Sequence, residues 1–235
     1  MLHMLLPFDQ HFDSGFGAVA DSFRYAADAL DDAPEAASLN PHLPVSFLYR
    51  HAIELYLKSG IITLHRKYAI PYGDTPSTGE PSILVGQKRK PLYNVHSLGP
   101  LYAELRSLLS LQAEPLSRIP RTDWTLPSEL DQWIAAIEET DSSSTFFRYP
   151  VTKDAERDSQ KSTIQREEIE AMIERMHGDG PKVKALLMLD SDGGVVEAFS
   201  HDDTRTKEVI VILKQTAELF HDLRAMMSYT LAGGR

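Results

Sequence analysis

Apolar side chains recur at three- and four-residue steps along most of the chain, which predicts a mainly α protein. This spacing extends from Phe8 to about Leu30, although two glycines weaken its first turns. The segment from about Leu43 to Tyr68 is apolar almost throughout and stops before Pro71. We therefore expect two helices in the first third of the chain.

Further helices are predicted in the rest of the chain from the same spacing and from capping residues. They run from Ser97 (as N-cap), from Ser128 (as N-cap) to Thr140, from Ile164 to about Met176, and from Thr206 to Leu231.

Two stretches interrupt the helical pattern. Residues 71–95 are rich in Pro, Gly, Ser and Thr and predict a loop insertion. Residues 153–203 begin with a polar linker and include two short apolar runs around "DSDGG". Asp-Gly and Gly-Gly are preferred turn dipeptides, so these runs predict a small β-hairpin. We expect one domain over residues 1–235 that carries both insertions.

Five polar side chains stand on the apolar segment from Val45 to His65. With 100° per residue and Arg50 at zero, they fall within an arc of roughly 100°. They are Arg50, His51, Glu54, Lys58 and His65.

Two interpretations of this arc stay open. The arc either faces water, where its i,i+4 pairs contribute about 0.2–0.5 kcal/mol each, or faces a groove between helices or subunits. In a groove the charges would need partners, because an unpaired buried charge costs several kcal/mol.

Three blocks of the sequence resemble a branch of the HEPN superfamily. They are "FLYRHAIELYLKS", "HSLGPLY" from His96 and "FFRYP" from Phe146 to Pro150. These all-helical bacterial and archaeal proteins are often found in toxin–antitoxin and phage-defence loci. The resemblance implies an up-and-down bundle of four or five helices that commonly dimerises, and it places His96 and Arg148 against the polar arc.

Active members of that superfamily are metal-independent endoribonucleases with an Arg followed four to six residues later by His on a late helix. Histidine can move a proton, and arginine can hold a phosphate. This chain has no such pair on its late helices. Arg89 and His96 have six residues between them and so match the spacing, but a proline lies between them and the segment is a predicted loop.

The resemblance therefore suggests an unusual site. Our candidates for catalysis are Arg50, His51, His96 and Arg148, and our candidates for binding are Glu54, Lys58, Tyr149, Lys88, Arg89 and Lys90. The last three form the densest basic cluster, which is either a phosphate-contacting loop or a solvated one.

Composition narrows the classes of function. The formal net charge of −10 disfavours a protein coated in basic surface, and the absence of cysteine excludes disulfides and thiolate metal sites. No apolar run is long enough for a membrane span, and the first residues lack a basic leader, so we expect a cytoplasmic protein.

No metal or cofactor is expected. "DSDGG" resembles the start of a calcium loop, but residue 201, at loop position twelve, is His rather than Glu. The chain also lacks HExxH, phosphate-binding, dinucleotide-binding and serine-hydrolase motifs.

Two functions remain open at this stage. One is an RNA-directed protein of defence or toxin–antitoxin type that binds or cleaves RNA. The alternative is a non-catalytic dimeric protein–protein interaction module in which the polar arc is a structural network. Expected partners are a second copy, RNA or the product of a neighbouring gene, and no membrane.

Overall fold

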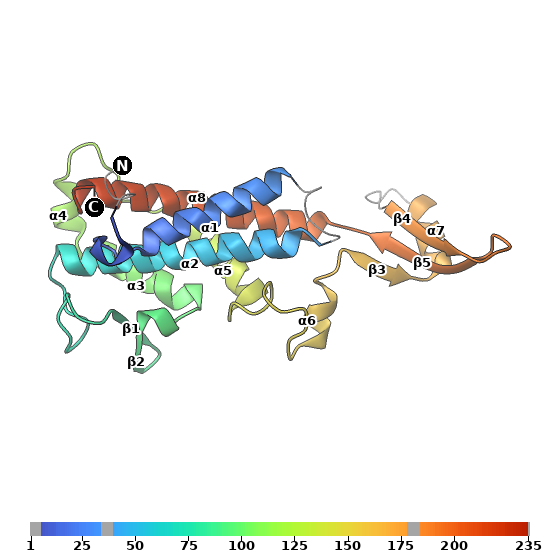
Figure 1. Cartoon of the computed structure of the whole chain (residues 1–235), viewed down its shortest axis with the longest axis horizontal. Coiled ribbons are helices and arrows are strands. Elements are labelled where there is room, and N and C mark those ends of the chain that lie inside the picture. Colours follow the sequence, from blue (N-terminus) through green and yellow to red (C-terminus); the bar gives the residue numbers. More distant parts are fainter. Residues whose placement is uncertain (1–5, 34–39, 178–183, 235) are drawn as a thin grey trace.

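The computed structural model describes residues 6–33, 40–177 and 184–234, and it is mainly helical with two small antiparallel sheets (Figure 1). An elongated helical bundle makes up most of the molecule, and a small arm projects from one end of it (Figure 1). The bundle helices are α1 (Phe16–Asp32), α2 (His42–Lys67), α3 (Leu98–Leu111), α4 (Ala113–Ser117), α5 (Glu129–Asp141) and α8 (Thr204–Thr230).

Helix α2 is the centre of the bundle because its apolar side chains point in nearly every direction. It packs against α1, α3 and α8, and Ile53, Leu57 and Ile61 are fully buried. Gly60 lets α3 approach closely, since a Cβ at this position would lie 3.0 Å from Leu105 Cδ1.

The connectivity differs from the strict up-and-down alternation that we expected. In Figure 1, α2, α3 and α8 all run toward the end of the bundle where α4 lies, and α1 and α5 run back. Helices α2 and α3 share a direction because residues 68–97 return along the bundle before α3 begins.

The first helix begins later than predicted. A 3-10 turn (η2, Phe8–Gln10) precedes α1, and Gly15 adopts a left-handed φ of 81°. The carboxylate of Asp13 accepts hydrogen bonds from the main-chain N–H groups of Gly15, at 3.0 Å, and of Gly17, at 2.8 Å. These hydrogen bonds satisfy main-chain N–H groups at the start of α1, where the two glycines interrupt the apolar spacing.

Part of the predicted loop at 71–95 is a β-hairpin instead. Strand β1 (Ser82–Val85) pairs with β2 (Lys88–Pro91), and a 3-10 turn (η4, Leu92–Asn94) follows. Gly86 has a φ of 63°, which a two-residue hairpin turn requires. Ile83 is fully buried and anchors the hairpin to the core.

Ser97 and Ser128 occupy the predicted N-cap positions, but neither side chain donates to or accepts from the main chain of the first turn of its helix. Ser97 donates its hydroxyl to the carbonyl of Ser142 at 2.9 Å, and Leu98 N–H donates to Glu138 Oε1 at 2.6 Å. The hydroxyl of Ser128 bonds to Glu129 rather than to the main chain. A carboxylate from α5 therefore satisfies the first turn of α3, a tertiary contact that sequence spacing does not reveal.

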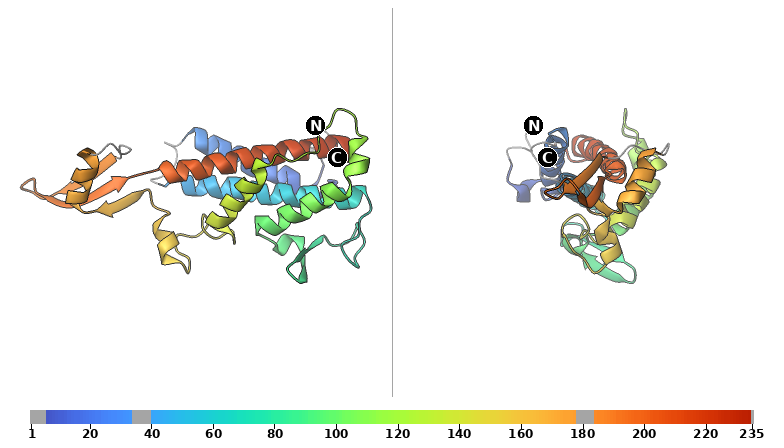
Figure 2. Two further views of the ribbon diagram at one scale, coloured as in Figure 1. Left: turned by 180° about the vertical axis from the view of Figure 1, so that it is seen from behind. Right: turned by 90° about the vertical axis from the view of Figure 1, so that its right-hand side faces the viewer.

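The arm consists of β3 (Ile164–Glu167), α7 (Ile169–His177), β4 (Lys184–Leu189) and β5 (Val195–His201), with strand order β3-β5-β4 (Figures 1 and 2). The helix predicted from Ile164 is wrong over its first four residues, which pair with β5. The predicted linker contains α6 (Ala155–Ser159), capped by Asp154, whose carboxylate accepts from Arg157 N–H at 3.1 Å.

The described helices include none that is both long enough and apolar enough to span a membrane.

Candidate functional site

The polar arc of α2 lies inside the bundle, so the interpretation in which it faces water is wrong. Arg50, Glu54, Lys58 and His65 are buried, and His51 is half-buried. His65 stacks on Tyr72 with ring centroids 4.0 Å apart and bonds through Nδ1 to the carbonyl of Ile70. Arg50, Glu54 and Lys58 belong to a connected network of charged side chains.

Arg50 is enclosed by protein on every edge of its guanidinium and is 0% exposed. Its Nη1 donates to Glu54 Oε2 at 3.2 Å, and its Nη2 donates to the carbonyl of His96 at 2.7 Å. Its Nε donates to the carbonyl of Asp141 at 3.3 Å and lies 3.3 Å from Asp141 Oδ2. A phosphate has no path to this side chain unless the bundle opens.

Glu54 joins the remaining members of this cluster. Its Oε1 accepts from Lys58 Nζ at 2.7 Å and lies 3.1 Å from His96 Nδ1. Burial would raise the pKa of Glu54, but the charge and hydrogen bond of Lys58, with His96 and Arg50, lower it below its ordinary value. We call Arg50, Glu54, Lys58, His96 and Asp141 the α2 charge network.

Two cations and two carboxylates balance within the α2 charge network, as buried ions require. Asp141 comes from the last turn of α5, and its Oδ1 also accepts from the main-chain N–H groups of Thr145 and Phe146. The His96 side chain is 49% exposed, so it forms the solvent-facing edge of the network. Sequence reasoning missed Asp141, because a helix-terminal Asp gives no sign of a distant partner.

His51 is packed between two aromatic rings. Its ring lies edge-on to Phe23 at 4.5 Å and parallel to Phe47 at 5.8 Å. Burial lowers the pKa of His51, and Glu54 offsets this only in part. A neutral ring in an aromatic sandwich is poorly placed to exchange protons with a substrate.

Arg148 and Tyr149 lie in the loop after α5, and both are exposed. The Arg148 guanidinium lies 5.3 Å from the centre of the Phe47 ring, and its Nη2 is 3.5 Å from Ser144 Oγ. The carbonyl of Tyr149 accepts from Lys161 Nζ at 2.8 Å. The structure thus brings Arg148 to an aromatic ring next to His51 rather than to the network carboxylates.

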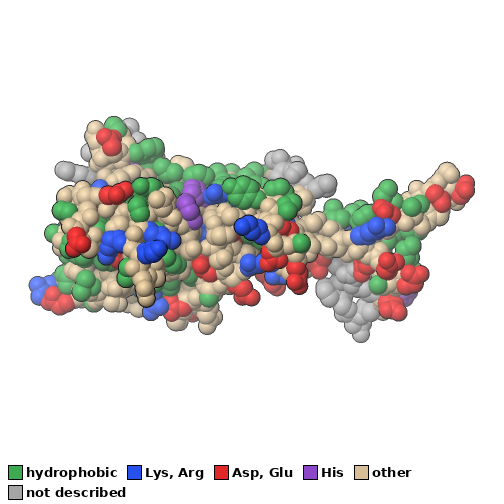
Figure 3. Space-filling view, turned by 90° about the horizontal axis from the view of Figure 1, so that it is seen from below, with side chains coloured by type: hydrophobic (Ala, Val, Ile, Leu, Met, Phe, Trp, Pro, Cys, Tyr) green, Lys and Arg blue, Asp and Glu red, His purple; other side chains and the backbone are tan. Residues whose placement is uncertain are grey.

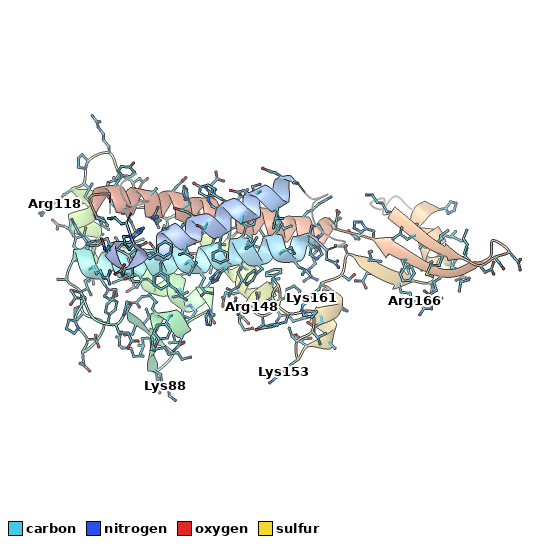
Figure 4. The ribbon with its side chains drawn as sticks, viewed as in Figure 1. Lys88, Arg118, Arg148, Lys153, Lys161 and Arg166 are labelled. Carbon is cyan, nitrogen blue, oxygen red and sulfur yellow. The ribbon has the colours of Figure 1, made fainter. Side chains whose placement is uncertain are left out.

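The basic cluster lies on β2, away from these groups. Lys88, Arg89 and Lys90 are exposed, and Arg89 donates to the carbonyl of Ser82 at 3.2 Å. Figure 4 shows Lys88 at the outer end of the hairpin, apart from Arg148. On this face, basic and acidic side chains are interspersed rather than gathered into one basic surface (Figure 3).

A second polar cluster, which we did not predict, lies between α1 and α8. Asp21 Oδ1 lies 2.8 Å from His221 Nδ1, and Asp21 Oδ2 accepts from Arg224 Nη1 at 3.1 Å. The hydroxyl of Tyr56 donates to Asp21 Oδ1 at 2.7 Å. Burial would raise the pKa of Asp21, but its bonds to His221 and Tyr56 and the charge of Arg224 lower it.

Asp21, His221 and Arg224 line a cavity of about 400 Å³, which we call the α1–α8 pocket. Tyr25 and Tyr229 also line it and are 55% and 73% exposed. Because the Asp21 carboxylate only accepts hydrogen bonds, the contact at 2.8 Å is made by a proton on His221 Nδ1. The pocket therefore combines a fixed imidazole, a guanidinium and aromatic walls.

One sequence signal for this pocket was available. His221 and Arg224 are three residues apart in the last helix and share one of its faces. Their order, with His before Arg, is the reverse of the Arg–His signature, so that signature does not mark them.

A metal site is not apparent in the parts of the chain that the structure describes, where no three His, Cys, Asp or Glu side chains gather suitably. In "DSDGG", Asp190 Oδ1 accepts from the main-chain N–H groups of Asp192, at 2.9 Å, and Gly194, at 2.7 Å. Its carboxylate closes the turn between β4 and β5.

No protein family, curated protein or solved structure matches this chain. Its function is therefore inferred from its own side chains.

Replacement of Glu54 by Ala should lower the free energy of unfolding by about 3–5 kcal/mol, because two buried cations lose their shared carboxylate. Urea unfolding followed by circular dichroism measures the loss. Glu114→Ala is the matched control, since Glu114 forms an i,i+4 pair with Arg118 on the surface, and it should cause no measurable loss. Equal losses in the two variants would contradict a structural role for the network.

Acidification should destabilise the protein through His51. Its folded pKa lies below the ordinary 6.5, so the unfolded chain binds more protons and stability falls as the pH drops below about 6.5. Since the ring is partly exposed, the effect between pH 7 and pH 5 should be less than about 1 kcal/mol. His51→Phe should flatten this part of the stability curve, and His177→Phe, at an exposed position, should not. Parallel curves for wild type and His51→Phe would refute the assignment.

Proposed function

We propose that this protein binds RNA at the α1–α8 pocket and acts there on a phosphodiester. The observation that supports this proposal is the pair of contacts from one carboxylate, Asp21, to His221 and Arg224 at 2.8 and 3.1 Å. In metal-independent RNA cleavage a histidine can move the proton of the 2′-hydroxyl and an arginine can hold the phosphate, and this cavity places the two side by side.

Each side chain has a distinct role in this proposal. Arg224 would hold a non-bridging phosphate oxygen through N–H groups that do not face Asp21. Nε2 of His221 would take the proton of the 2′-hydroxyl as that oxygen attacks phosphorus. The bond from phosphorus to the 5′-oxygen breaks, and the leaving oxygen takes a proton from water. The products are a 2′,3′-cyclic phosphate and a 5′-hydroxyl.

The walls of the pocket suit a nucleotide ligand. Tyr25 and Tyr229 present exposed rings beside the charged pair. Base–aromatic stacking contributes about 1–3 kcal/mol per base and tolerates any sequence. These rings would supply affinity that an acidic protein cannot obtain from its overall charge.

The resemblance to the HEPN superfamily agrees with this location, since both charged side chains stand on the last long helix. Their order, with His before Arg, differs from the usual signature. A HEPN-like bundle and a role in defence or toxin–antitoxin systems are part of the proposal. Lys88, Arg89 and Lys90 would at most attract RNA from a distance.

Arg224→Gln should weaken binding to single-stranded RNA about tenfold or more, because a charge-assisted bond to phosphate is lost. His221→Gln should abolish cleavage and leave binding within a few-fold of wild type. Gel-shift titration and end-labelled total RNA measure the two effects.

His177→Gln is the matched control, since it makes the same change at an exposed histidine on α7. It should match wild type in both assays, and melting curves should show all variants folded. Undetectable RNA binding by folded wild type, or equal activity in His221→Gln, would refute the proposal.

The second candidate is the non-catalytic dimeric interaction module, and the enclosure of Arg50 favours it. A fully buried guanidinium bonded to Glu54 and to two main-chain carbonyls has a structural role that requires no ligand. Under this candidate, RNA is neither bound nor cleaved, and substitutions at His221 and Arg224 affect only stability.

A further inference from the structure

Strand β4 is an unusually apolar edge strand. It lies at the outside of the order β3-β5-β4, and the part of the chain that the structure describes places no strand on its other side. All six of its residues are exposed. Four consecutive residues carry large apolar side chains that are 48%, 50%, 55% and 59% exposed: Leu186, Leu187, Met188 and Leu189. Soluble proteins normally protect such edges with charges, prolines or covering elements.

The hydrogen-bonding direction of the strand determines which main-chain groups are open. Asp190 N–H donates to the carbonyl of Gly194 at 2.8 Å, toward β5. Main-chain groups alternate in direction along a strand, and the extra residue of the bulge lies on β5, opposite Met188 and Leu189. Counting back from Asp190, the N–H and C=O groups of Leu189, Leu187 and Ala185 point to the open edge.

We propose that β4 pairs antiparallel with β4 of a second copy of this chain, centred on Leu187. Leu187 then faces its own counterpart across a two-fold axis, and Ala185 faces Leu189. Both pairs bring open N–H and C=O groups together, so each can exchange two main-chain hydrogen bonds.

Charge complementarity favours a second copy over another partner. In this register Lys184 of one copy lies opposite Asp190 of the other, and symmetry repeats the pair at the other end of the strand. Leu186 lies opposite Met188 on the same face, between these charged pairs. A self-complementary pattern of opposite charges around apolar residues fixes the register, whereas a one-residue slip would lose both ion pairs.

The shape of the molecule permits this pairing. The sheet stands beyond the end of the bundle in both side views (Figures 1 and 2). Two three-stranded sheets would join into one continuous sheet. Each copy would contribute an apolar edge that is otherwise exposed to water.

The first test is sedimentation velocity on the full chain from about 1 to 300 μM. Wild type should dimerise within this range. Leu187→Lys should raise the dissociation constant at least tenfold, because two lysines would meet at the centre of the interface. Leu84→Lys is the matched control, because Leu84 is a leucine 55% exposed on a strand of the other sheet, and it should dimerise like wild type. A wild type that is monomeric at 300 μM would overturn the proposal, as would a dimer unaffected by Leu187→Lys.

Charge variants test the register without touching the apolar row. Lys184→Glu should weaken the dimer about tenfold, because it places two carboxylates opposite each other at both ends. Asp190→Asn keeps the oxygen that accepts the turn hydrogen bonds but removes the charge, so adding it to Lys184→Glu should restore most of the lost affinity. Equal affinities for Lys184→Glu and the double variant would overturn this register.

Discussion

The bundle depends on the pairing of the buried Arg50 guanidinium with carboxylates and main-chain carbonyls. Helix α2 is surrounded by α1, α3 and α8, so its polar residues must find partners within the protein. Glu54 supplies one partner from the next turn of the same helix, and Asp141 supplies the other from α5. The carbonyl of His96, two residues before α3, accepts a further hydrogen bond from Arg50. Two segments that are distant in sequence, the end of α5 and the residues before α3, are thereby fixed against α2.

This constraint separates structural from functional charges. Arg50 and Arg224 both contact carboxylates, yet their surroundings differ. The Arg50 side chain is 0% exposed, whereas the Arg224 side chain is 10% exposed and lines a cavity together with His221. A ligand phosphate in the cavity can compete with Asp21 for Arg224, but to reach Arg50 it would have to open the bundle. The pocket between α1 and α8 is for this reason a better place for anion chemistry than the polar arc of α2.

Sequence periodicity predicted the long helices well because burial of apolar faces decides them. The limits of α2 and α8 agree with the expected ones to within two residues at each end. The pattern failed where tertiary contacts decide the outcome. Glu138 satisfies the start of α3 in place of Ser97, and residues 164–167 join a sheet because β5 offers them a partner. Neither partner is near in sequence.

In the candidate site, too, the features set by local sequence were predictable and those set by tertiary contacts were not. That the polar arc gathers on one side followed from helix geometry, and its contact with His96 followed from the resemblance; Glu54 does lie 3.1 Å from that ring. The network carboxylate of Asp141 could not be foreseen, because nothing local marks an acidic residue at a helix end as buried. His221 and Arg224 were visible as a pair on one face of α8. Their significance depends on Asp21, which lies 200 residues from His221 along the chain.

Helix α8 connects the two proposals while keeping them independent. It begins three residues after β5 ends, and it carries His221 in its C-terminal half. Thr204 and His221 are 17 positions apart, which corresponds to about 26 Å at 1.5 Å of rise per residue. The pocket is lined by α1, α8 and the segment before α1 of one chain, so pairing through β4 neither completes nor blocks it. Joined arms would place two complete pockets on separate bundles. Under the proposed function, a dimer of this kind would therefore bind two stretches of RNA, or one long stretch at two points, without a composite site.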